Sequence, residues 1–415
     1  MKESIVFRKL FAILMFLVFL VFNIAASVAV VVEKSDIIFS EGNILYVGGS
    51  GPGNYSEIQD AIEDANNGDT VFVFSGIYAA DIIIDKSIYL IGENQKTTII
   101  ENGNNGISII ADGVLVERFT IEKCGGFWHR CGIYIGSNHN KISNVTIANN
   151  GVLNGIFIED SYDNTVSNNI IEDNSYFGIR LEYSSQNTIM KNYVSNVVTN
   201  GIILTGSSDN MVFLNTVREC TWGGIKLDEF SFDNKLYHNN FIDNDYDNGA
   251  DNGSNIWDDD YPSGGNYWSD YDGEDNDEDG IGDTPYLIPG GENMDRYPFM
   301  NALGLPEMPI ISGPIHGKVG EKYDWTFLST DPDEHDVYYW IQWGDDTSSN
   351  GWIGPYNSGE EVIVSHTYAR EGTFIIKAKA KDEHELESSW GQLSVSMPRN
   401  IIKNFMLRTI IDLFK

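Results

Sequence analysis

Gly-Ile-Tyr-Ile at residues 132–135 is the first of five closely similar phrases in this chain. The others are Gly-Ile-Phe-Ile at 155–158, Gly-Ile-Arg-Leu at 178–181, Gly-Ile-Ile-Leu at 201–204 and Gly-Ile-Lys-Leu at 224–227. Each phrase begins 23 residues after the one before it. A fixed period of about 20 to 50 residues indicates a solenoid, a propeller or an array of repeated units.

Asparagines recur with nearly the same period after each phrase. In one series an apolar residue stands two positions after each asparagine, and this series comprises Asn140, Asn164, Asn187, Asn210 and Asn234. A second series comprises Asn144, Asn168, Asn192, Asn215 and Asn239. Asparagine tolerates left-handed turns, and identical side chains on stacked strands form hydrogen-bonded ladders. We therefore expect asparagine ladders between successive repeats.

Each repeat contains three short β-rich runs separated by Gly, Asn, Ser and Asp turns, with no helical segment. This pattern predicts an all-β fold, a parallel β-helix solenoid over residues 40–255. The apolar residues of each phrase alternate with variable ones, so they are expected to point inward and stack on those of the next coil. The alternative is a β-sandwich with accidental repeats, which the equal spacings disfavour.

The chain has 415 residues and a formal net charge of −35. Its length is enough for two or three domains. So acidic a chain is unsuited to bind nucleic acid or an anionic membrane directly, because both are negatively charged. The composition suits an extracellular protein surrounded by cations or salt.

The first 30 residues are expected to be a targeting segment. Lys2, Arg8 and Lys9 precede an apolar run at 10–22, and Ser-Val-Ala at 27–29 resembles a cleavage site. The apolar stretch continues weakly to Val32, so an uncleaved anchor is the alternative to a cleaved signal peptide. Either interpretation places the rest of the chain at the cell surface or outside the cell.

The three cysteines are too few for a disulfide scaffold. Export would allow Cys124 and Cys131 to form a disulfide across the short loop at 125–130. The alternative there is a metal site with His129 as an extra ligand. We expect Cys220 to be a buried packing residue.

A capping helix is expected at 55–65, because Ile58, Ala61, Ile62 and Ala65 fall on one helical face. Ser at 56 and Gln at 59 match a capping box. A helix at this position would cover the open strand edges at the end of a solenoid.

This helix, Gly-Asp-Thr at 68–70, Gly-Ile-Tyr at 76–78 and the 23-residue repeats resemble right-handed parallel β-helix proteins of the pectin-lyase-like superfamily. The pattern is similar in particular to NosD-like, carbohydrate-associated proteins with PbH1 repeats on archaeal cell surfaces. The resemblance covers residues 40 to about 300 and implies a right-handed solenoid. It implies little about activity, because the superfamily includes lyases, hydrolases, epimerases, binding proteins and copper-linked periplasmic proteins.

Aromatic and acidic residues dominate 256–303, which we expect to cap the solenoid. Residues 275–283 read Asp-Asn-Asp-Glu-Asp-Gly-Ile-Gly-Asp. Carboxylates at alternating positions around a glycine turn are suitable ligands for calcium, so this loop predicts a calcium cofactor. The expected ligands are the side chains of Asp275, Asp277, Asp279 and Asp283 and the carbonyl of Ile281. The loop lacks the final Glu of an EF-hand and is more similar to thrombospondin or dockerin calcium loops; the alternative is a solvated acidic loop.

Residues 304–314 are rich in proline and predict a linker. Short strand-like runs over 315–397 predict an immunoglobulin-like β-sandwich. Trp-Gly-Asp-Asp-Thr at 343–347, His-Thr-Tyr at 366–368 and Gly-Thr-Phe at 372–374 resemble the PKD domain family, which usually has glycine where Asp346 stands. That resemblance implies a spacer or contact module without a catalytic group. The basic, apolar tail at 398–415 is expected either to lie on a membrane or envelope surface or to form no extended contact of its own.

One outward face of the solenoid carries the candidate site. Glu159 and Glu182 occupy the same column of this face, where neighbours lie about 4.8 Å apart. This spacing suits the carboxylate pair of a retaining glycosidase, and Arg180 stands beside it, so these three residues are the catalytic candidates. The aromatic residues expected to stack on sugar rings are Phe157, Tyr176, Phe177 and Trp222. The alternative is an ordinary solvated sheet face.

The sequence thus predicts an exported β-helix protein that binds polysaccharide or a glycosylated envelope and is stabilised by calcium. The alternatives are a polysaccharide lyase, epimerase or glycoside hydrolase, a structural envelope protein, and a copper-linked periplasmic protein. Copper is less well supported, because the histidines are scattered and no Met or Cys cluster accompanies them. Nucleic acid is not an expected partner, and membrane contact is expected only through the N-terminal segment or the C-terminal tail.

Overall fold

The computed structural model describes residues 42–125, 131–151, 154–174, 176–333, 335–349 and 351–397. The predicted targeting segment at 1–30, the aromatic part of the loop at 126–130 and the tail at 398–415 lie outside these residues. Among the described helices, none combines the length and the hydropathy needed to cross a membrane.

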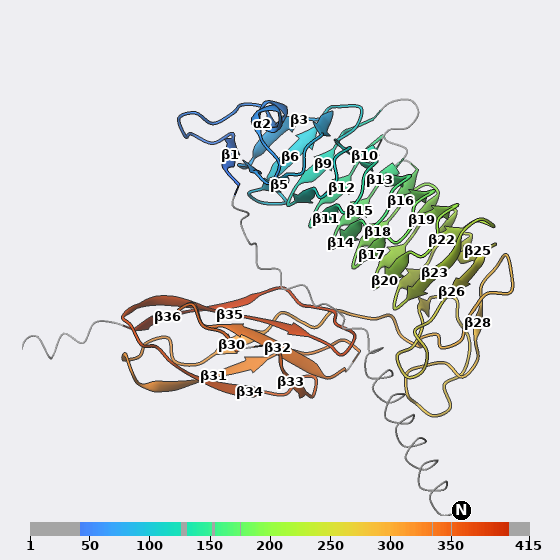
Figure 1. Cartoon of the computed structure of the whole chain (residues 1–415). Helices are drawn as coiled ribbons and strands as arrows, with labels where there is room; N and C mark the ends of the chain where they lie inside the picture. Colours follow the sequence, from blue (N-terminus) through green and yellow to red (C-terminus); the bar gives the residue numbers. More distant parts are fainter. Residues whose placement is uncertain are drawn as a thin grey trace, which may run out of the picture. The chain divides into compact units, whose positions relative to one another are not determined.

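Three parallel sheets form the repeated part of the chain, and successive coils add strands to the same three sheets (Figure 1). The first sheet contains β1 (Ile44–Val47), β2 (Thr70–Val73), β5 (Tyr89–Gly92), β8 (Leu115–Glu117), β11 (Lys141–Ser143), β14 (Thr165–Ser167), β17 (Thr188–Met190), β20 (Met211–Phe213), β23 (Phe232–Tyr237) and β26 (Ser254–Ile256). The second contains β4 (Ile82–Ile84), β7 (Ile107–Ile109), β10 (Cys131–Ile135), β13 (Asn154–Glu159), β16 (Phe177–Glu182), β19 (Asn200–Thr205), β22 (Gly223–Leu227) and β25 (Asp247–Asp251). The third contains β3 (Gly76–Ala79), β6 (Thr98–Glu101), β9 (Thr120–Glu122), β12 (Thr146–Ala148), β15 (Ile170–Glu172), β18 (Tyr193–Ser195), β21 (Thr216–Arg218), β24 (Asn240–Ile242) and β27 (Tyr267–Trp268).

Aliphatic side chains stack inside these sheets from coil to coil. Ile133 pairs with Ile156, and Ile156 pairs with Ile179, in parallel register. All three side chains are fully buried in a core that extends along the solenoid. The predicted all-β parallel solenoid, with its apolar residues pointing inward, is therefore confirmed.

The glycine that opens each phrase is explained by the close approach of neighbouring coils. A Cβ atom on Gly178 would lie 2.4 Å from the carbonyl oxygen of Gly201 and 2.4 Å from Cγ1 of Val194. Both distances are far below van der Waals contact, so a larger residue would push two coils apart. The periodic glycine thus reflects a steric limit at one corner of the solenoid.

Two buried asparagine ladders connect the coils. In each ladder, Nδ2 of one asparagine donates to Oδ1 of the asparagine in the next coil, over 2.9–3.1 Å. The first ladder comprises Asn140, Asn164, Asn187, Asn210, Asn234 and Asn255. The second comprises Asn169, Asn192, Asn215, Asn239 and Asn266.

Asn144 and Asn168, which the sequence assigns to the second ladder, instead occupy turns. Both are exposed and have positive φ angles, 54° and 57°. The neighbouring Asn169 enters the ladder in place of Asn168. The Asn-Asn pair therefore uses both properties of asparagine, the left-handed turn at its first residue and the ladder at its second.

Each ladder ends on a carboxylate at its C-terminal end. Asn255 Nδ2 donates to both side-chain oxygens of Asp251, at 2.9 and 3.1 Å. Asn266 Nδ2 donates to Asp295 Oδ2 at 3.3 Å. A shorter series of the same kind consists of Asn244, Asn248 and Asp270.

A short helix, α2 (Ile58–Asp64), covers the N-terminal end of the solenoid with its apolar face buried (Figure 1). The predicted capping box is wrong, because Glu57 is the N-cap residue and makes no side-chain capping bond. Gln59 Oε1 instead accepts the backbone N–H of Ile83 at 2.9 Å. Lys86 Nζ donates to three carbonyls at the C-terminal end of the helix, which ties the helix to the second sheet.

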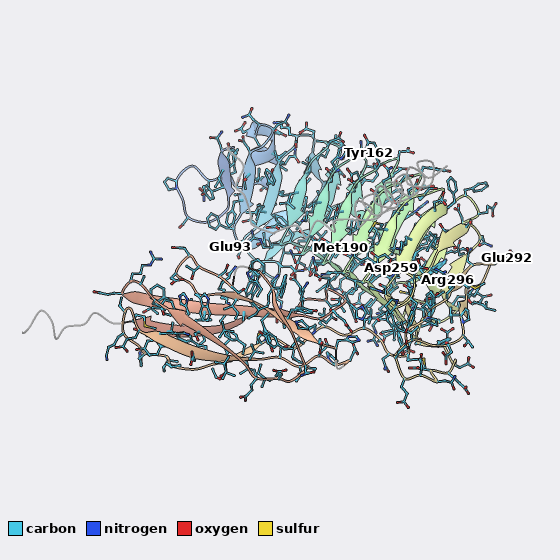
Figure 2. All side chains as sticks on the ribbon, turned by 60° about the horizontal axis from the view of Figure 1, so that its bottom comes forward. Glu93, Tyr162, Met190, Asp259, Glu292 and Arg296 are labelled. Atoms are coloured by element: carbon cyan, nitrogen blue, oxygen red, sulfur yellow. The ribbon has the colours of Figure 1, made fainter. Side chains whose placement is uncertain are left out.

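Residues 256–303 close the other end and add the antiparallel pair β28 (Tyr286–Leu287) and β29 (Met294–Asp295). Trp257 and Trp268 extend the solenoid core into this cap. Arg296 Nε donates to Asp258 Oδ2 at 2.9 Å. Burial would raise the pKa of Asp258, but the hydrogen bonds from Arg296 outweigh it and lower that pKa. Figure 2 labels Arg296 and the neighbouring Asp259 in this cap.

An antiparallel β-sandwich follows the cap, with Trp325, Tyr339 and Tyr368 in its core. One sheet contains β30 (Ile310–Ser312), β31 (Lys322–Leu328) and β34 (Val362–Thr367). The other contains β33 (Ile353–Tyr356), β32 (Val337–Gln342), β35 (Gly372–Lys381) and β36 (Gly391–Met397). The predicted immunoglobulin-like sandwich is confirmed, although β30 falls within 304–314, where the sequence predicts a linker. Asp346 has a φ of +70°, which accounts for the glycine usual at this position.

We predict that Asn192→Asp lowers the free energy of unfolding by about 3 kcal/mol or more. The substitution removes the donor to Val166 O and to Asn215 Oδ1 and places a carboxylate in a buried site. Urea unfolding followed by circular dichroism measures the change. Asn196→Asp, an exposed change of the same chemistry in the same coil, is the control and should stay within about 0.5 kcal/mol. Equal losses in the two variants would contradict a stabilising role for the ladder.

Candidate functional site

The second sheet carries the predicted site residues on its outer face. Tyr134 pairs with Phe157, and Phe157 pairs with Arg180, in adjacent strands. In a parallel column, Glu159 pairs with Glu182. The structure therefore places the catalytic candidates side by side, in the register that the repeat predicts.

Each candidate carboxylate already has a partner. Tyr134 Oη donates to Glu159 Oε2 at 3.0 Å, and Arg180 Nη2 donates to Glu182 Oε2 at 2.6 Å. Burial, followed by the hydrogen bond to Glu159, raises the pKa of Tyr134 to about 12, so its hydroxyl stays protonated at neutral pH. The two carboxylates are thus a hydrogen-bond acceptor and a member of an ion pair, and neither is presented as a free acid or base.

Phe157 lies beneath this face, with only 1% of its surface exposed. The Arg180 guanidinium lies 4.9 Å from the centre of the Phe157 ring and 5.6 Å from that of Phe177. The Tyr134 ring packs edge-on against Phe157 from the other side. Because adjacent strands are so close, these larger side chains cover Phe157, which corrects the prediction that it contacts a ligand. Phe177 remains half-buried under Arg180.

Tyr176 and Trp222 lie in equivalent turns, immediately before β16 and β22. Thr199 occupies this position in the coil between them: its N–H donates to Tyr176 O, and Trp222 N–H donates to Thr199 O, both at 3.1 Å. The strand register places Tyr246 one coil beyond Trp222. Tyr176, Trp222 and Tyr246 are 38%, 63% and 81% exposed. We call these three residues the aromatic row.

Sequence reasoning missed Tyr246, because the strand that follows it reads Asp-Asn-Gly-Ala-Asp and lacks the Gly-Ile phrase. Its signal is positional, since it stands 24 residues after Trp222 and 23-residue and 24-residue steps both occur in this solenoid. Other exposed rings, such as Tyr162 (Figure 2), lie in the turns at the opposite ends of these strands and do not continue the row.

The acidic loop brings three predicted calcium ligands together. Oxygens of Asp275, Asp277 and Asp279 all lie within 4.8 Å of one another. Gly280 N–H donates to Asp275 Oδ2 at 2.9 Å, and Gly280 has a φ of +86°, so the glycine turn lets the chain fold back around the carboxylates. Desolvation, and then the negative charge of Asp279, raises the pKa of Asp277. A cation would relieve this repulsion.

The other two predicted calcium ligands have partners within the cap. Asp283 Oδ2 accepts the backbone N–H and the side-chain N–H of Asn276, at 2.8 and 2.7 Å, and these bonds lower the pKa of Asp283. Ile281 is bridged to Phe299 and mostly buried. Asp283 thus closes the loop onto its own start.

Three histidines that are scattered in the sequence lie together in the structure. The His384 ring centre is 5.0 Å from that of His238 and 4.7 Å from that of His335. Sequence reasoning missed this cluster because His238 belongs to the solenoid and the other two to separate loops of the sandwich. The available signal was the tripeptide Asp-Glu-His, which occurs at both 333–335 and 382–384. His129, proposed as an extra ligand near the cysteines, lies outside the described residues.

The predicted disulfide is wrong, because Cys124, Cys131 and Cys220 are all buried free thiols. Cys124 follows β9 of the third sheet, and its Sγ approaches Glu122 O at 3.5 Å. Cys131 opens β10 of the second sheet, and its Sγ accepts from Asn154 Nδ2 at 3.7 Å. The two thiols therefore belong to different sheets. Burial raises the pKa of Cys124 to about 11 and the pKa values of the other two to about 12.

Comparisons with known proteins agree with the solenoid. A family model described as "Periplasmic copper-binding protein (NosD)" matches residues 62–273, about half of the chain. No curated protein shows significant similarity to the chain.

Solved structures resemble both parts of the chain. The PKD domain of an M14-like peptidase from Thermoplasmatales archaeon SCGC AB-540-F20 is 49% identical, over 24% of this chain and 100% of that one, with a TM-score of 0.23. This identity over the whole of the smaller domain shows that the sandwich is PKD-like.

The two solenoid neighbours are more distant. The catalytic domain of a GH87 α-1,3-glucanase in complex with nigerose is 15% identical over 56% of this chain and 48% of that one, with a TM-score of 0.40. The tailspike protein gp49 from Acinetobacter baumannii bacteriophage Fri1, a capsular polysaccharide depolymerase, is 11% identical over 83% and 75%, with a TM-score of 0.31. Scores this low carry no argument about activity.

We predict that Ellman's reagent labels no cysteine in the native chain and labels three after unfolding in denaturant without reductant. The reason is that the thiols are buried and protonated. Cys220→Ser should reduce the count after unfolding to two. A count of one in the unfolded wild-type chain would instead show that Cys124 and Cys131 are joined.

Proposed function

The chain belongs to the NosD family, and we propose that it is an exported protein that binds an extended polysaccharide along its aromatic row. The observation that carries this proposal is the row itself, in which Tyr176, Trp222 and Tyr246 stand exposed at equivalent positions of the solenoid. Flat amphipathic rings supply large contact areas at little entropic cost. Exposed apolar side chains gathered in one place mark interaction sites.

The spacing of the row favours a linear polymer over a single small ligand. Adjacent coils are about 4.8 Å apart, so Tyr176 and Trp222 are separated by about 10 Å along the solenoid and Tyr246 lies about 5 Å further on. A ligand that contacts all three rings must therefore extend along the solenoid axis. A chain of sugar units, which presents an apolar ring face at regular intervals, meets this requirement.

Charge narrows the class of polysaccharide. The chain carries a net charge of −35, and the face beside the row holds Glu159 and Glu182. An acidic polysaccharide would be repelled by this field. Arg180 does not offset it, because it is already paired with Glu182. We therefore propose a neutral polysaccharide.

The contacts of the two glutamates support binding without cleavage. A retaining glycosidase needs one carboxylate free to attack and another free to donate a proton. Here Glu159 accepts from Tyr134 and Glu182 is held by Arg180. An enzyme that uses this pair would have to break both contacts when substrate binds.

The family description also names copper, and the matched solenoid segment does not fit a copper site. Within the described part of residues 62–273, no three His, Cys, Asp or Glu side chains converge on one point. The thiols of that segment are buried and protonated, whereas copper binds the thiolate. We therefore assign no copper chemistry to the solenoid.

We predict that Trp222→Ala weakens binding of a neutral polysaccharide about tenfold or more, because a ring that anchors an interface carries more than about 1.4 kcal/mol. Retention of the full chain on a panel of immobilised neutral and acidic glycans, in calcium, identifies the ligand. Calorimetry then gives the affinity. The control is Phe230→Ala, which removes a ring of similar exposure at the other end of β22. Equal affinities for the wild type and the Trp222 variant would refute the row as the binding site.

The same panel separates binding from catalysis when released sugar ends are counted. Retention without new ends supports the proposed binding function. New ends that disappear in Glu182→Gln would make the chain an enzyme that uses the predicted pair, and would overturn the binding proposal.

We propose further that the acidic loop binds calcium and stabilises the cap. The supporting observations are the convergence of Asp275, Asp277 and Asp279 and the raised pKa of Asp277. Oxygen ligands of this number and type suit Ca²⁺.

We predict that calcium at about 100 times its dissociation constant adds about 2.7 kcal/mol to the free energy of unfolding of the cap. Asp277→Asn should abolish most of this gain, since it removes a ligand from the centre of the cluster. Glu278→Gln changes one charge in the same loop outside the cluster and should retain the gain. Thermal unfolding with calcium and with a chelator measures both; identical midpoints for the wild type in the two conditions would exclude the site.

A further inference from the structure

The sandwich brings two histidines and several carboxylates together at one point. His335 precedes β32, and His384 lies in the loop between β35 and β36. The ligand atoms of His335, Glu383 and His384 all lie within 4.8 Å of one another. On the other side of the same imidazole, His335 Nδ1 lies 3.6 Å from Asp331 Oδ1. These four side chains come from one domain, so the cluster does not depend on any neighbouring part.

Several polar atoms in this cluster are buried and have no hydrogen-bond partner. The Asp331 side chain is fully buried, and its Oδ2 atom makes no hydrogen bond. His335 Nδ1 also makes none, because 3.6 Å is too long for a hydrogen bond. Buried polar groups in folded proteins almost always have a partner, and a buried carboxylate without one is costly. A bound cation would satisfy both groups.

The imidazoles are suited to bind a metal. Burial, followed by the proximity of His238 and His335, lowers the pKa of His384 to about 3, so its ring is neutral and keeps a lone pair. His238, whose ring adjoins that of His384, contacts Ser263 O through Nε2 at 2.8 Å. A histidine that binds a metal through one ring nitrogen commonly donates from the other to a backbone carbonyl. His238 therefore offers its Nδ1 atom on the same side as the cluster.

The ligand types indicate the class of ion. Two neutral imidazoles with one or two carboxylates are the donors preferred by Zn²⁺ and Cu²⁺, whereas Ca²⁺ and Mg²⁺ take oxygen ligands almost exclusively. Access is open, because the Glu383 side chain is 54% exposed and that of His335 is 22% exposed. An ion can thus reach the buried Asp331 carboxylate from solvent.

We propose that His335, Glu383, His384 and Asp331 form a binding site for a divalent transition-metal ion of the Zn²⁺ or Cu²⁺ class. The site lies in the PKD-like sandwich, outside the residues that match the NosD family and apart from the acidic loop and the aromatic row. It is independent of the proposed polysaccharide function. Its position next to His238 would make metal binding fix the sandwich loops against the solenoid.

Calorimetric titration of the untagged full chain with ZnCl₂, and separately with CuSO₄, tests the proposal. Calcium is kept in excess so that the acidic loop does not take up the added ion. We expect one equivalent of at least one of the two ions to bind, and the visible absorption of bound Cu²⁺ to show nitrogen ligation. His335→Gln and His384→Gln should each weaken this binding by at least about tenfold. The matched control is His316→Gln, an exposed histidine of the same domain, which should bind as the wild type does.

Circular dichroism and thermal unfolding in a chelator confirm that each variant is folded, so a loss of binding reports on the site. Two outcomes would overturn the proposal. One is the absence of binding of either ion to the folded wild-type chain at micromolar concentrations. The other is unchanged binding in both the His335 and His384 variants, which would place the ion elsewhere.

Discussion

Side-chain amides that bond from one coil to the next hold the register on which the rest of this structure depends. Parallel coils could in principle slide past one another, because every backbone strand pairs with its neighbours in a repetitive manner. The buried asparagines prevent this, since a slip of one residue would leave both ends of each amide without partners. Once the register is fixed, residues at equivalent positions must stack, and the apolar core, the paired glutamates and the aromatic row all follow.

The regularity that makes the fold stable also makes much of it predictable. The 23-residue period, the alternating apolar positions and the recurrent asparagines predicted the three-sheet solenoid, its inward residues and one complete ladder. The period also placed Glu159 beside Glu182 and Trp222 at an exposed turn. These predictions succeeded because they concern a residue and its equivalent in the next coil, which the repeat relates directly.

The failures concern relations that a repeat does not encode. Phe157 stands in an outward column, but its exposure depends on the size of Tyr134 and Arg180 in adjacent coils. Cys124 and Cys131 are near in sequence, yet a corner of the solenoid separates the sheets that hold them. The histidine cluster joins three loops that are remote in the chain, and a small apolar cluster that includes Leu214, Phe299 and Leu386 accompanies it. Only tertiary packing brings such groups together.

The ladders also give the solenoid an electrical direction. In every step the amide N–H group points toward the C-terminal coil and the oxygen toward the N-terminal one, so the side-chain dipoles add along the axis as peptide dipoles do in a helix. The carboxylates of Asp251 and Asp295 stand at the positive end of these rows. An ionised carboxylate accepts but cannot donate onward, so it terminates the series. Repeats can therefore be gained or lost within the solenoid, where each amide finds another amide, but the series cannot be lengthened beyond its acidic end.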